Sequence, residues 1–212
     1  MKDASGSRQV DNGAMEGKVR VRRTIAAALP PGARILEGFA GEGAMYDAVW
    51  AAFPCGLAID HARDKVRTAA RRRPDWSVYA GDTERALSAG VGAAVPFDVV
   101  DLDAYGSPWK YVRAWLLSER ARADRTTVVL TDGYMARASL SALDGTLFHG
   151  VDMRRMNVPP QLYFETVRAR LSEWCETARL TPESFDTYQI QHAAGKIPMR
   201  AHVLRFGRLP AV

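Results

Sequence analysis

The segment FDVVDLDAYGSP, residues 97–108, combines an apolar strand with an acidic end, an aromatic residue and a sharp turn. Asp101 and Asp103 lie at the carboxyl end of the predicted strand, where open α/β sheets bind their ligands. Carboxylates at that position suit a ligand that carries hydroxyl, amino or cationic groups. Ser107 and Pro108 are predicted to be the N-cap and the first residue of the following helix.

Acidic residues also end the other predicted strands. Asp60 comes roughly 20 residues after a glycine-rich turn, the position of the ribose-hydroxyl partner in nucleotide-binding βαβ units. Asp82 is predicted either to cap the next helix or to accept a hydrogen bond from an adenine amino group. A row of acidic residues along one edge of the sheet indicates a site for an adenosine-containing ligand with a positive centre and no phosphate. These residues are Glu37, Asp60, Asp82, Asp101, Asp103 and Asp132.

The glycine-rich turn lies in the sequence EGFAGEG, residues 37–43. Gly38, Gly41 and Gly43 allow the backbone to approach a ligand closely, and the next helix points its free N–H groups there. No Gly-Lys-Ser/Thr follows, so the turn is not a P-loop. Glu37 would repel a pyrophosphate, which again favours a ligand without phosphate.

Strand-like and helix-like segments alternate along the chain, which predicts an α/β, Rossmann-like, doubly wound and mostly parallel sheet. Two final runs, 185–192 and 199–206, predict a C-terminal antiparallel hairpin with a turn at 193–196, and they complete seven strands. Residues 1–14 are predicted to be a flexible tail and 15–212 a single domain. The other strands are expected at 35–36, 57–60, 76–80, 97–102 and 126–133. Helices are expected at 15–29, 45–53, 63–73, 109–116 and 161–180, with another after Asp82.

The formal net charge of +5 favours a polyanionic partner such as RNA or DNA. The predicted helices at 15–29 and 63–73 are strongly basic, and each is either a solvated surface or a phosphate-binding face. Arg22, in the first of them, is a candidate substrate contact. The loop-rich segment 134–160 adds the candidate phosphate contacts Arg137, Arg154 and Arg155.

Targeting signals and metal-binding patterns are not evident in the sequence. No apolar run approaches the roughly 18 residues of a membrane span, and the first residues lack a signal-peptide core. Cys55 and Cys175 lie far apart without metal-ligand spacing. They are expected to be reduced, which indicates a cytoplasmic location.

Taken together, these elements resemble a class I S-adenosylmethionine-dependent methyltransferase. DLDAYGSP is similar to the Asp-Leu-Asp-Pro-Phe-Gly-Ser-Pro segment of the tRNA guanine-N2 dimethyltransferases, and Thr131-Asp132 resembles their fifth-strand Thr-Asp. The match spans about residues 33–206. The resemblance implies S-adenosyl-L-methionine as the cofactor, with Asp60 at its ribose and Asp82 at its adenine. The residues expected to bind the cofactor are Glu37, Phe39, Gly41, Gly43, Asp60, His61, Asp82 and Asp101.

The resemblance also implies a mechanism for methylating an exocyclic amine of a nucleic-acid base. Asp103 would accept one N–H hydrogen bond and the backbone carbonyl of Ala104 another, which aims the nitrogen lone pair at the cofactor methyl. Asp103 is also a candidate to take the proton as the methyl arrives. Tyr105 would stack on the base, an interaction worth ~1–3 kcal/mol. The implied partner is RNA of a tRNA-like kind, and the implied role is tRNA processing.

The chain departs from the family in two ways. Ala104 stands where the family has proline, and the additional C-terminal domain that helps to hold tRNA is missing. The alternatives are therefore a DNA base amino-methyltransferase, a small-molecule or protein methyltransferase, and a non-catalytic methyltransferase fold that binds nucleic acid.

Overall fold

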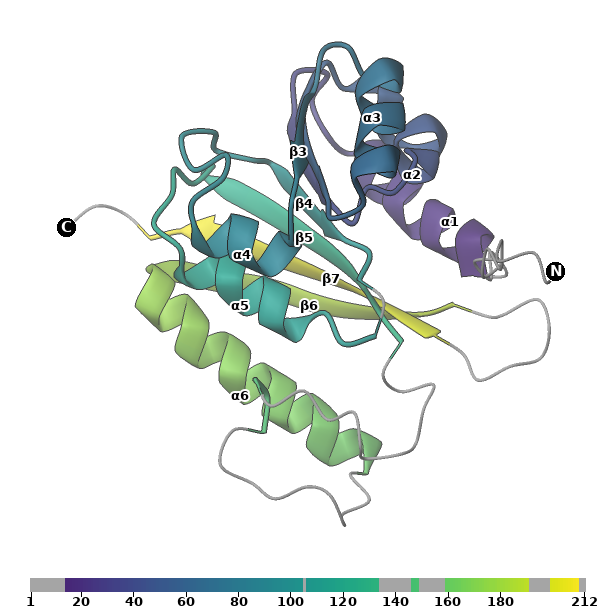
Figure 1. Ribbon diagram of the computed structural model, residues 1–212. Coiled ribbons are helices and arrows are strands. Elements are labelled where there is room, and N and C mark those ends of the chain that lie inside the picture. Colours follow the sequence, from purple (N-terminus) through teal and green to yellow (C-terminus); the bar gives the residue numbers. More distant parts are fainter. Residues whose placement is uncertain (1–13, 105, 134–145, 149–158, 191–198, 210–212) are drawn as a thin grey trace, which may run out of the picture.

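Strands and helices alternate as far as β5, and a long helix and two long strands follow (Figure 1). The computed structural model describes residues 14–104, 106–133, 146–148, 159–190 and 199–209. The strands are β1 (Arg34–Gly38), β2 (Cys55–Asp60), β3 (Ser77–Ala80), β4 (Val99–Leu102), β5 (Arg125–Asp132), β6 (Leu180–Ile190) and β7 (Met199–Arg208). The helices are α1 (Met15–Ala26), α2 (Ala44–Ala48), the 3-10 helix η2 (Trp50–Ala52), α3 (Arg63–Arg72), α4 (Thr83–Ser88), α5 (Trp109–Leu117) and α6 (Pro160–Ala178).

The described strands form one seven-stranded sheet in the order β3-β2-β1-β4-β5-β7-β6. Strands β1 to β5 pair in parallel, and β7 runs antiparallel between β5 and β6. The predicted sheet with a C-terminal antiparallel hairpin is confirmed. Because the parallel strands end at the same edge, the acidic residues at their ends are brought together there, and Glu37 lies directly beside Asp101.

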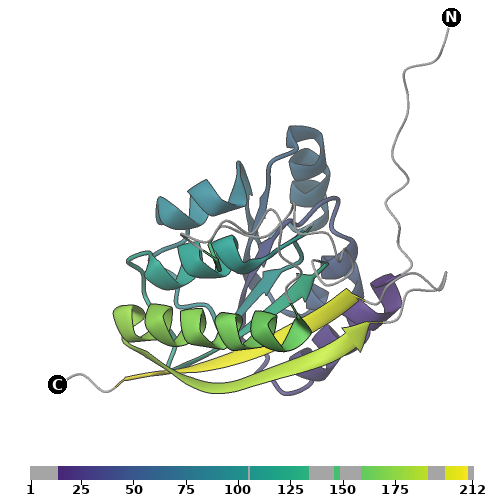
Figure 2. The ribbon, with the colours of Figure 1, turned by 90° about the horizontal axis from the view of Figure 1, so that it is seen from below.

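Helices cover both faces of the sheet. Helices α4, α5 and α6 form one layer (Figure 2), and their apolar side chains share a core with inward-facing residues such as Leu36, Val100 and Leu204. On the other face, α1 and the segment α2–η2 contribute Ile25 and Trp50 to a second core. No helix in the described part of the chain is long and apolar enough to cross a membrane.

The largest departure from the predicted elements lies after the glycine-rich turn. Apolar spacing predicts one helix through Phe53, but α2 ends at Ala48, and Val49 leaves helical geometry with φ −137°. The break turns Trp50 inward, where its indole N–H donates to Asp101 Oδ2 at 2.9 Å. A buried indole needs such a partner, so tertiary hydrogen bonding overrides the helical pattern here.

Other boundaries shift less. α5 begins at Trp109, so Pro108 rather than Ser107 occupies the N-cap position. α1 ends at Ala26 rather than at Leu29, and β6 begins at Leu180, well before the predicted start of the hairpin. The predicted tail through residue 13, the turn at 193–196 and most of the segment 134–160 lie outside the described residues.

Gly56 of β2 is required by the packing of Trp76. A Cβ atom at residue 56 would lie 2.4 Å from Trp76 Cε2. The indole N–H donates to the carbonyl of Phe53 at 2.8 Å, so the ring is held against the strand. We expect Gly56→Ala to lower the free energy of unfolding by about 1–3 kcal/mol, as overpacking does. Gly32→Ala is the control, because a Cβ there would meet no atom within 4 Å; equal urea midpoints for the two variants would contradict the prediction.

Candidate functional site

The turn between β1 and α2 forms one side of the acidic edge. Its backbone is left-handed at Phe39, Gly41 and Gly43, with φ of 63°, 54° and 98°. A Cβ at Gly43 would also lie 3.1 Å from Arg73 Nη2, so glycine is needed there. The ring of Phe39 packs edge-on against Tyr111 of α5 with centroids 4.6 Å apart, which compensates for its unfavourable φ.

Asp60, at the end of β2, fixes this turn. Its Oδ2 accepts the backbone N–H of Gly41 at 2.8 Å, and its Oδ1 accepts that of Ala62 at 2.9 Å. A carboxylate has about four lone-pair sites, so Asp60 can still accept hydrogen bonds from the hydroxyls of a ribose. The side chain of His61 is 79% exposed beside it, with Nδ1 3.6 Å from Asp60 Oδ1.

Asp82 caps α4. Its Oδ1 accepts the backbone N–H of Arg85 at 2.9 Å, which confirms the predicted cap. The residue is exposed and its Oδ2 receives no hydrogen bond among the described residues, so the cap leaves an acceptor at this edge. Capping and binding of an adenine amino group are thus compatible.

Asp101 is buried and fully engaged by other residues. Arg22 of α1 donates to its two oxygens from Nε at 2.7 Å and Nη2 at 2.6 Å, and the indole N–H of Trp50 adds a third bond. The Arg22 side chain is 0% exposed. Burial alone would lower the pKa of Arg22, but Asp101 raises it above its ordinary value. This bidentate pair attaches α1 to the centre of the sheet.

Glu37 forms a second buried pair. Its Oε2 accepts from Arg73 Nη1 at 2.6 Å, and Arg73 stacks over the rings of Tyr46 and Trp76. Burial raises the pKa of Glu37 to about 8; the neighbouring Asp101 adds to the rise, whereas Arg73 lowers it. Glu37 therefore supports the edge from inside, and its carboxylate is not open to a ligand.

Asp103 differs from its neighbours because it is partly accessible. Its side chain is 23% exposed, and Lys18 Nζ lies 2.7 Å from Oδ1 while donating its hydrogen bond to Oδ2 at 3.0 Å. Oδ1 is a buried atom that contacts the ammonium group of Lys18. Burial would raise the pKa of Asp103, but Arg22 and Lys18 together lower it below its ordinary value. Asp103 is therefore an ionised and partly exposed acceptor.

The backbone after Asp103 is tied to the neighbouring strand. Ala104 is 2% exposed, Gly106 has φ 98°, and the carbonyl of Gly106 accepts the N–H of Gly133 at 3.2 Å. This bond joins the turn after β4 to the end of β5. It holds the predicted catalytic segment at the carboxyl edge of the sheet.

Asp132 belongs to a buried network that the sequence did not suggest. Its Oδ2 accepts from the hydroxyl of Tyr163 at 2.5 Å and lies 3.4 Å from His202 Nε2. The indole of Trp109 donates to the same tyrosine hydroxyl at 2.7 Å. Asp132 thus connects β5 to α5, α6 and β7. No signal in the sequence marks Tyr163 and His202 as members of this network, because each fits the ordinary apolar pattern of its helix or strand.

The structure brings together most of the predicted site residues, and it corrects some of their roles. Asp60, Asp82 and Asp103 keep acceptor capacity at the edge. Glu37, Asp101 and Asp132 face internal partners instead. Arg22 was predicted to contact substrate, but its guanidinium is buried against Asp101 and cannot reach a phosphate in this conformation. Tyr105, Arg137, Arg154 and Arg155 lie outside the described residues.

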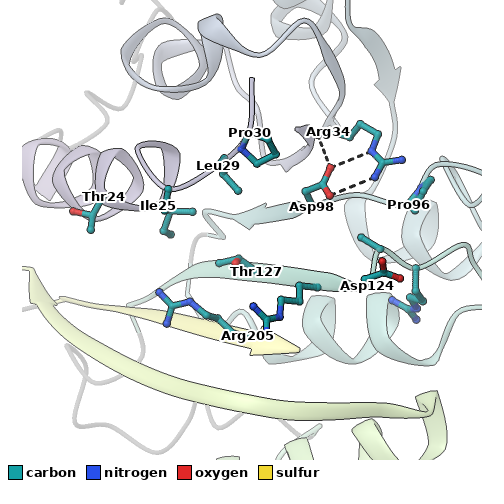
Figure 3. Close-up of a pocket in the computed structure, with 14 residues that line it drawn as sticks. Thr24, Ile25, Leu29, Pro30, Arg34, Pro96, Asp98, Asp124, Thr127 and Arg205 are labelled. Carbon is teal, nitrogen blue, oxygen red and sulfur yellow. Dashed lines mark hydrogen bonds and ion pairs between the residues drawn. The ribbon is translucent and has the colours of Figure 1, made fainter. Parts of the chain in front are cut away.

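A cavity of about 620 Å³ lies at the opposite end of the sheet (Figure 3). Residues near the amino ends of β1, β4 and β5 line it, together with Leu29 and Pro30 after α1. Asp98 accepts from Arg34 Nε at 3.0 Å and Nη2 at 3.3 Å across its wall. None of the predicted site residues lines this cavity, so it is separate from the acidic edge.

Comparison with known proteins identifies the fold. No protein-family model matches the chain, and no curated protein is significantly similar to it in sequence. Trm1 from Pyrococcus horikoshii, solved with S-adenosyl-L-methionine, aligns with a TM-score of 0.62 and 12% identity over 93% of this chain and 55% of its own. TYW2 from M. jannaschii, in complex with AdoMet, aligns with a TM-score of 0.59 and 13% identity over 92% and 77%.

A third structure, a Pyrococcus horikoshii protein described as an RNA methyltransferase, aligns with a TM-score of 0.54 and 12% identity over 94% of this chain and 84% of its own. The chain therefore has the class I S-adenosylmethionine-dependent methyltransferase fold. It spans just over half the length of Trm1.

The Arg22–Asp101 pair gives a stability prediction. Asp101→Ala leaves a guanidinium buried without its counter-charge, so we expect a loss of about 3–5 kcal/mol in the free energy of unfolding, measured by urea denaturation. The double variant Arg22→Met/Asp101→Leu removes both charges and is expected to recover most of that loss.

The exposed pair Arg205–Asp186, at 2.7 Å, is the control. Asp186→Ala is expected to cost less than about 1 kcal/mol, because exposed pairs contribute little. If Asp101→Ala lowers the free energy of unfolding by no more than Asp186→Ala does, the buried pair does not hold α1 to the sheet.

Proposed function

We propose that this protein is an S-adenosylmethionine-dependent methyltransferase that acts on an exocyclic amine of an RNA base. The observation that carries the proposal is the state of Asp103. It is the partly exposed carboxylate at the end of β4, and its pKa is lowered, so it is ionised. An ionised carboxylate that is open at this edge can accept the N–H group of an amine.

The residues beside Asp103 suit the cofactor. Asp60 keeps lone pairs for ribose hydroxyls, and Asp82 keeps an acceptor for the adenine amino group. Around Gly41, a Cβ would meet no atom closer than 4.0 Å, so the turn offers open space at the backbone. The bound cofactor would supply an activated methyl group on a positively charged sulfur, which is compatible with an acidic, phosphate-free edge.

Asp103 and the backbone carbonyl of Ala104 would orient the target nitrogen. The lone pair of an exocyclic amine is delocalised into the ring, so the amine is a weak nucleophile. Accepting both of its N–H groups favours a pyramidal nitrogen whose lone pair points at the methyl group. Methyl transfer would form the N–C bond as the cofactor's S–C bond breaks, and the nitrogen would then release one proton to Asp103 or to water. Most of the rate enhancement would come from this positioning.

Three observations support RNA as the substrate. The segment DLDAYGSP resembles the motif of the tRNA guanine-N2 dimethyltransferases, and one similar structure is described as an RNA methyltransferase. The net charge of +5 agrees with a polyanionic substrate. Tyr105 is proposed to stack on the target base, and Arg137, Arg154 and Arg155 to contact phosphates.

Methyl transfer from tritium-labelled S-adenosylmethionine tests the proposal, with bulk tRNA, rRNA, duplex DNA and a nucleic-acid-free lysate fraction as parallel acceptors. We expect label in RNA. Asp103→Ala is expected to reduce transfer at least about 100-fold, because the amine loses its orientation, while cofactor affinity stays within about twofold. Asp124→Ala is the control, because Asp124 is exposed at the opposite end of the sheet.

Each other outcome would change the assignment. Label in DNA alone would make the protein a DNA base methyltransferase. Label confined to the nucleic-acid-free fraction would indicate a small-molecule or protein substrate. Equal loss of transfer and of cofactor binding in Asp103→Ala would contradict the role of Asp103.

The lowered pKa of Asp103 gives a pH prediction. A carboxyl group whose pKa is lowered in the folded protein stays ionised until the pH falls through that lowered value, so kcat should be nearly constant from about pH 8 to about pH 5. Lys18→Met removes one of the two cations that lower the pKa of Asp103. We expect this variant to show an acid limb in kcat at higher pH than the wild type.

Arg20→Met serves as the control, because Arg20 is exposed on the same helix and forms no ion pair with the described residues. A pH–rate profile for Lys18→Met that coincides with the wild-type profile would contradict the electrostatic role of Lys18.

A further inference from the structure

The outer surface of α3 carries a row of unpaired arginines. Arg63, Arg67 and Arg71 are all exposed and follow one another at intervals of four residues, so they lie along one stripe of the helix. No ion pair or hydrogen bond joins their side chains to the residues that the structure describes. Asp64 is adjacent in sequence and pairs with none of them. These three arginines are called the α3 stripe.

Four other cations nearby are paired with carboxylates. Arg72 pairs with Asp47 at 2.8 Å, and Arg73 pairs with Glu37 at 2.6 Å. On α1, Lys18 pairs with Asp103 and Arg22 with Asp101. The stripe therefore contributes positive charge that the described fold does not compensate.

The stripe does not stabilise the helix. Like charges four residues apart destabilise a helix by about 0.2–0.5 kcal/mol per pair. The packing of α3 depends on its opposite side, where Ala69 is 1% exposed and the helix contacts β2 and β3. An anionic partner would turn this repulsion into attraction.

The stripe begins close to the candidate active site. α3 starts three residues after Asp60, at the carboxyl edge of the sheet, and runs along the outside of the molecule (Figure 1). Successive arginines of the stripe are separated by about 6 Å along the helix axis, from the rise of 1.5 Å per residue. The α3 stripe thus leads away from the carboxyl edge of the sheet, and Arg63 is its residue nearest to Asp60.

We propose that the α3 stripe binds the phosphate backbone of the RNA strand whose target base enters the site at Asp103. The choice of RNA rests on the proposed function, whereas the binding of a phosphate chain rests on the stripe itself. Guanidinium groups donate in a planar fork that matches phosphate oxygens, and such contacts release counterions. The stripe would contact phosphate groups of the substrate, which Arg22 cannot do because it is buried against Asp101.

The test compares wild type with Arg63→Ala/Arg67→Ala/Arg71→Ala. Binding of a fluorescent single-stranded oligoribonucleotide and of bulk tRNA is measured by anisotropy at several salt concentrations. Losing three phosphate contacts should make the slope of log K against log salt shallower by about 2, since each contact contributes roughly 0.7 for single strands. Affinity at about 0.1 M salt should fall at least tenfold. Cofactor affinity should be unchanged, which shows that the variant is folded.

The matched control removes the same charge elsewhere. Arg113, Arg179 and Arg208 are exposed, form no ion pair with the described residues, and lie on α5, at the end of α6 and on β7, away from α3. Their triple alanine variant should keep a slope close to that of the wild type. Equal effects of the two triple variants would overturn the proposal, because net charge alone would then explain binding. Absence of RNA binding by the wild type would also overturn it.

Failure of the catalytic assignment and failure of the α3 stripe proposal give different results. If no RNA accepts a methyl group, yet the α3 variant alone weakens RNA binding, the stripe is supported and the catalytic assignment fails. If methyl transfer to RNA occurs and both triple variants bind RNA like the wild type, the catalytic assignment is supported and the stripe fails.

Discussion

The buried pairing of carboxylates with arginines at the carboxyl edge is the interaction on which the rest of this structure depends. Glu37 and Asp101 lie side by side on β1 and β4 and are both buried. Removing one partner of a buried pair typically costs about 3–5 kcal/mol. Arg22 pairs with Asp101 and Arg73 pairs with Glu37, and Arg73 lowers the pKa of Glu37 against the larger effect of burial, which raises it to about 8. The same contacts fix α1 and the end of α3 against the sheet.

This pairing divides the acidic edge into supporting and ligand-facing groups. Asp60 and Asp82 use backbone N–H groups as partners and keep unused acceptor sites. Asp103 follows β4, on the other side of β1 from Asp60 and Asp82, and Arg22 and Lys18 lower its pKa despite its burial. The cations on α1 therefore set the charge of the group proposed to orient the substrate, although they are not themselves placed to react.

The sequence was sufficient to predict the sheet, its hairpin and the edge at which the acidic residues gather, because alternation of strands and helices determines where parallel strands end. It did not reveal which carboxylates are buried. Arg22 and Arg63 both belong to basic helices, yet one is buried in an ion pair and the other is exposed. That difference depends on how each helix packs against the sheet. Likewise, the hydrogen bond from Trp50 to Asp101 interrupts a helix that local apolar spacing predicts to continue.

The central claim is that Asp103 is ionised because two cations of α1 surround it. The most direct measurement is a titration of its carboxyl carbon by NMR in protein labelled with ¹³C-aspartate, with Asp103→Asn used to assign the signal. The account predicts a titration midpoint below the ordinary range of aspartate, or no protonation before the protein unfolds in acid. A midpoint at or above the ordinary value would contradict it, because burial rather than the cations would then control the charge of Asp103.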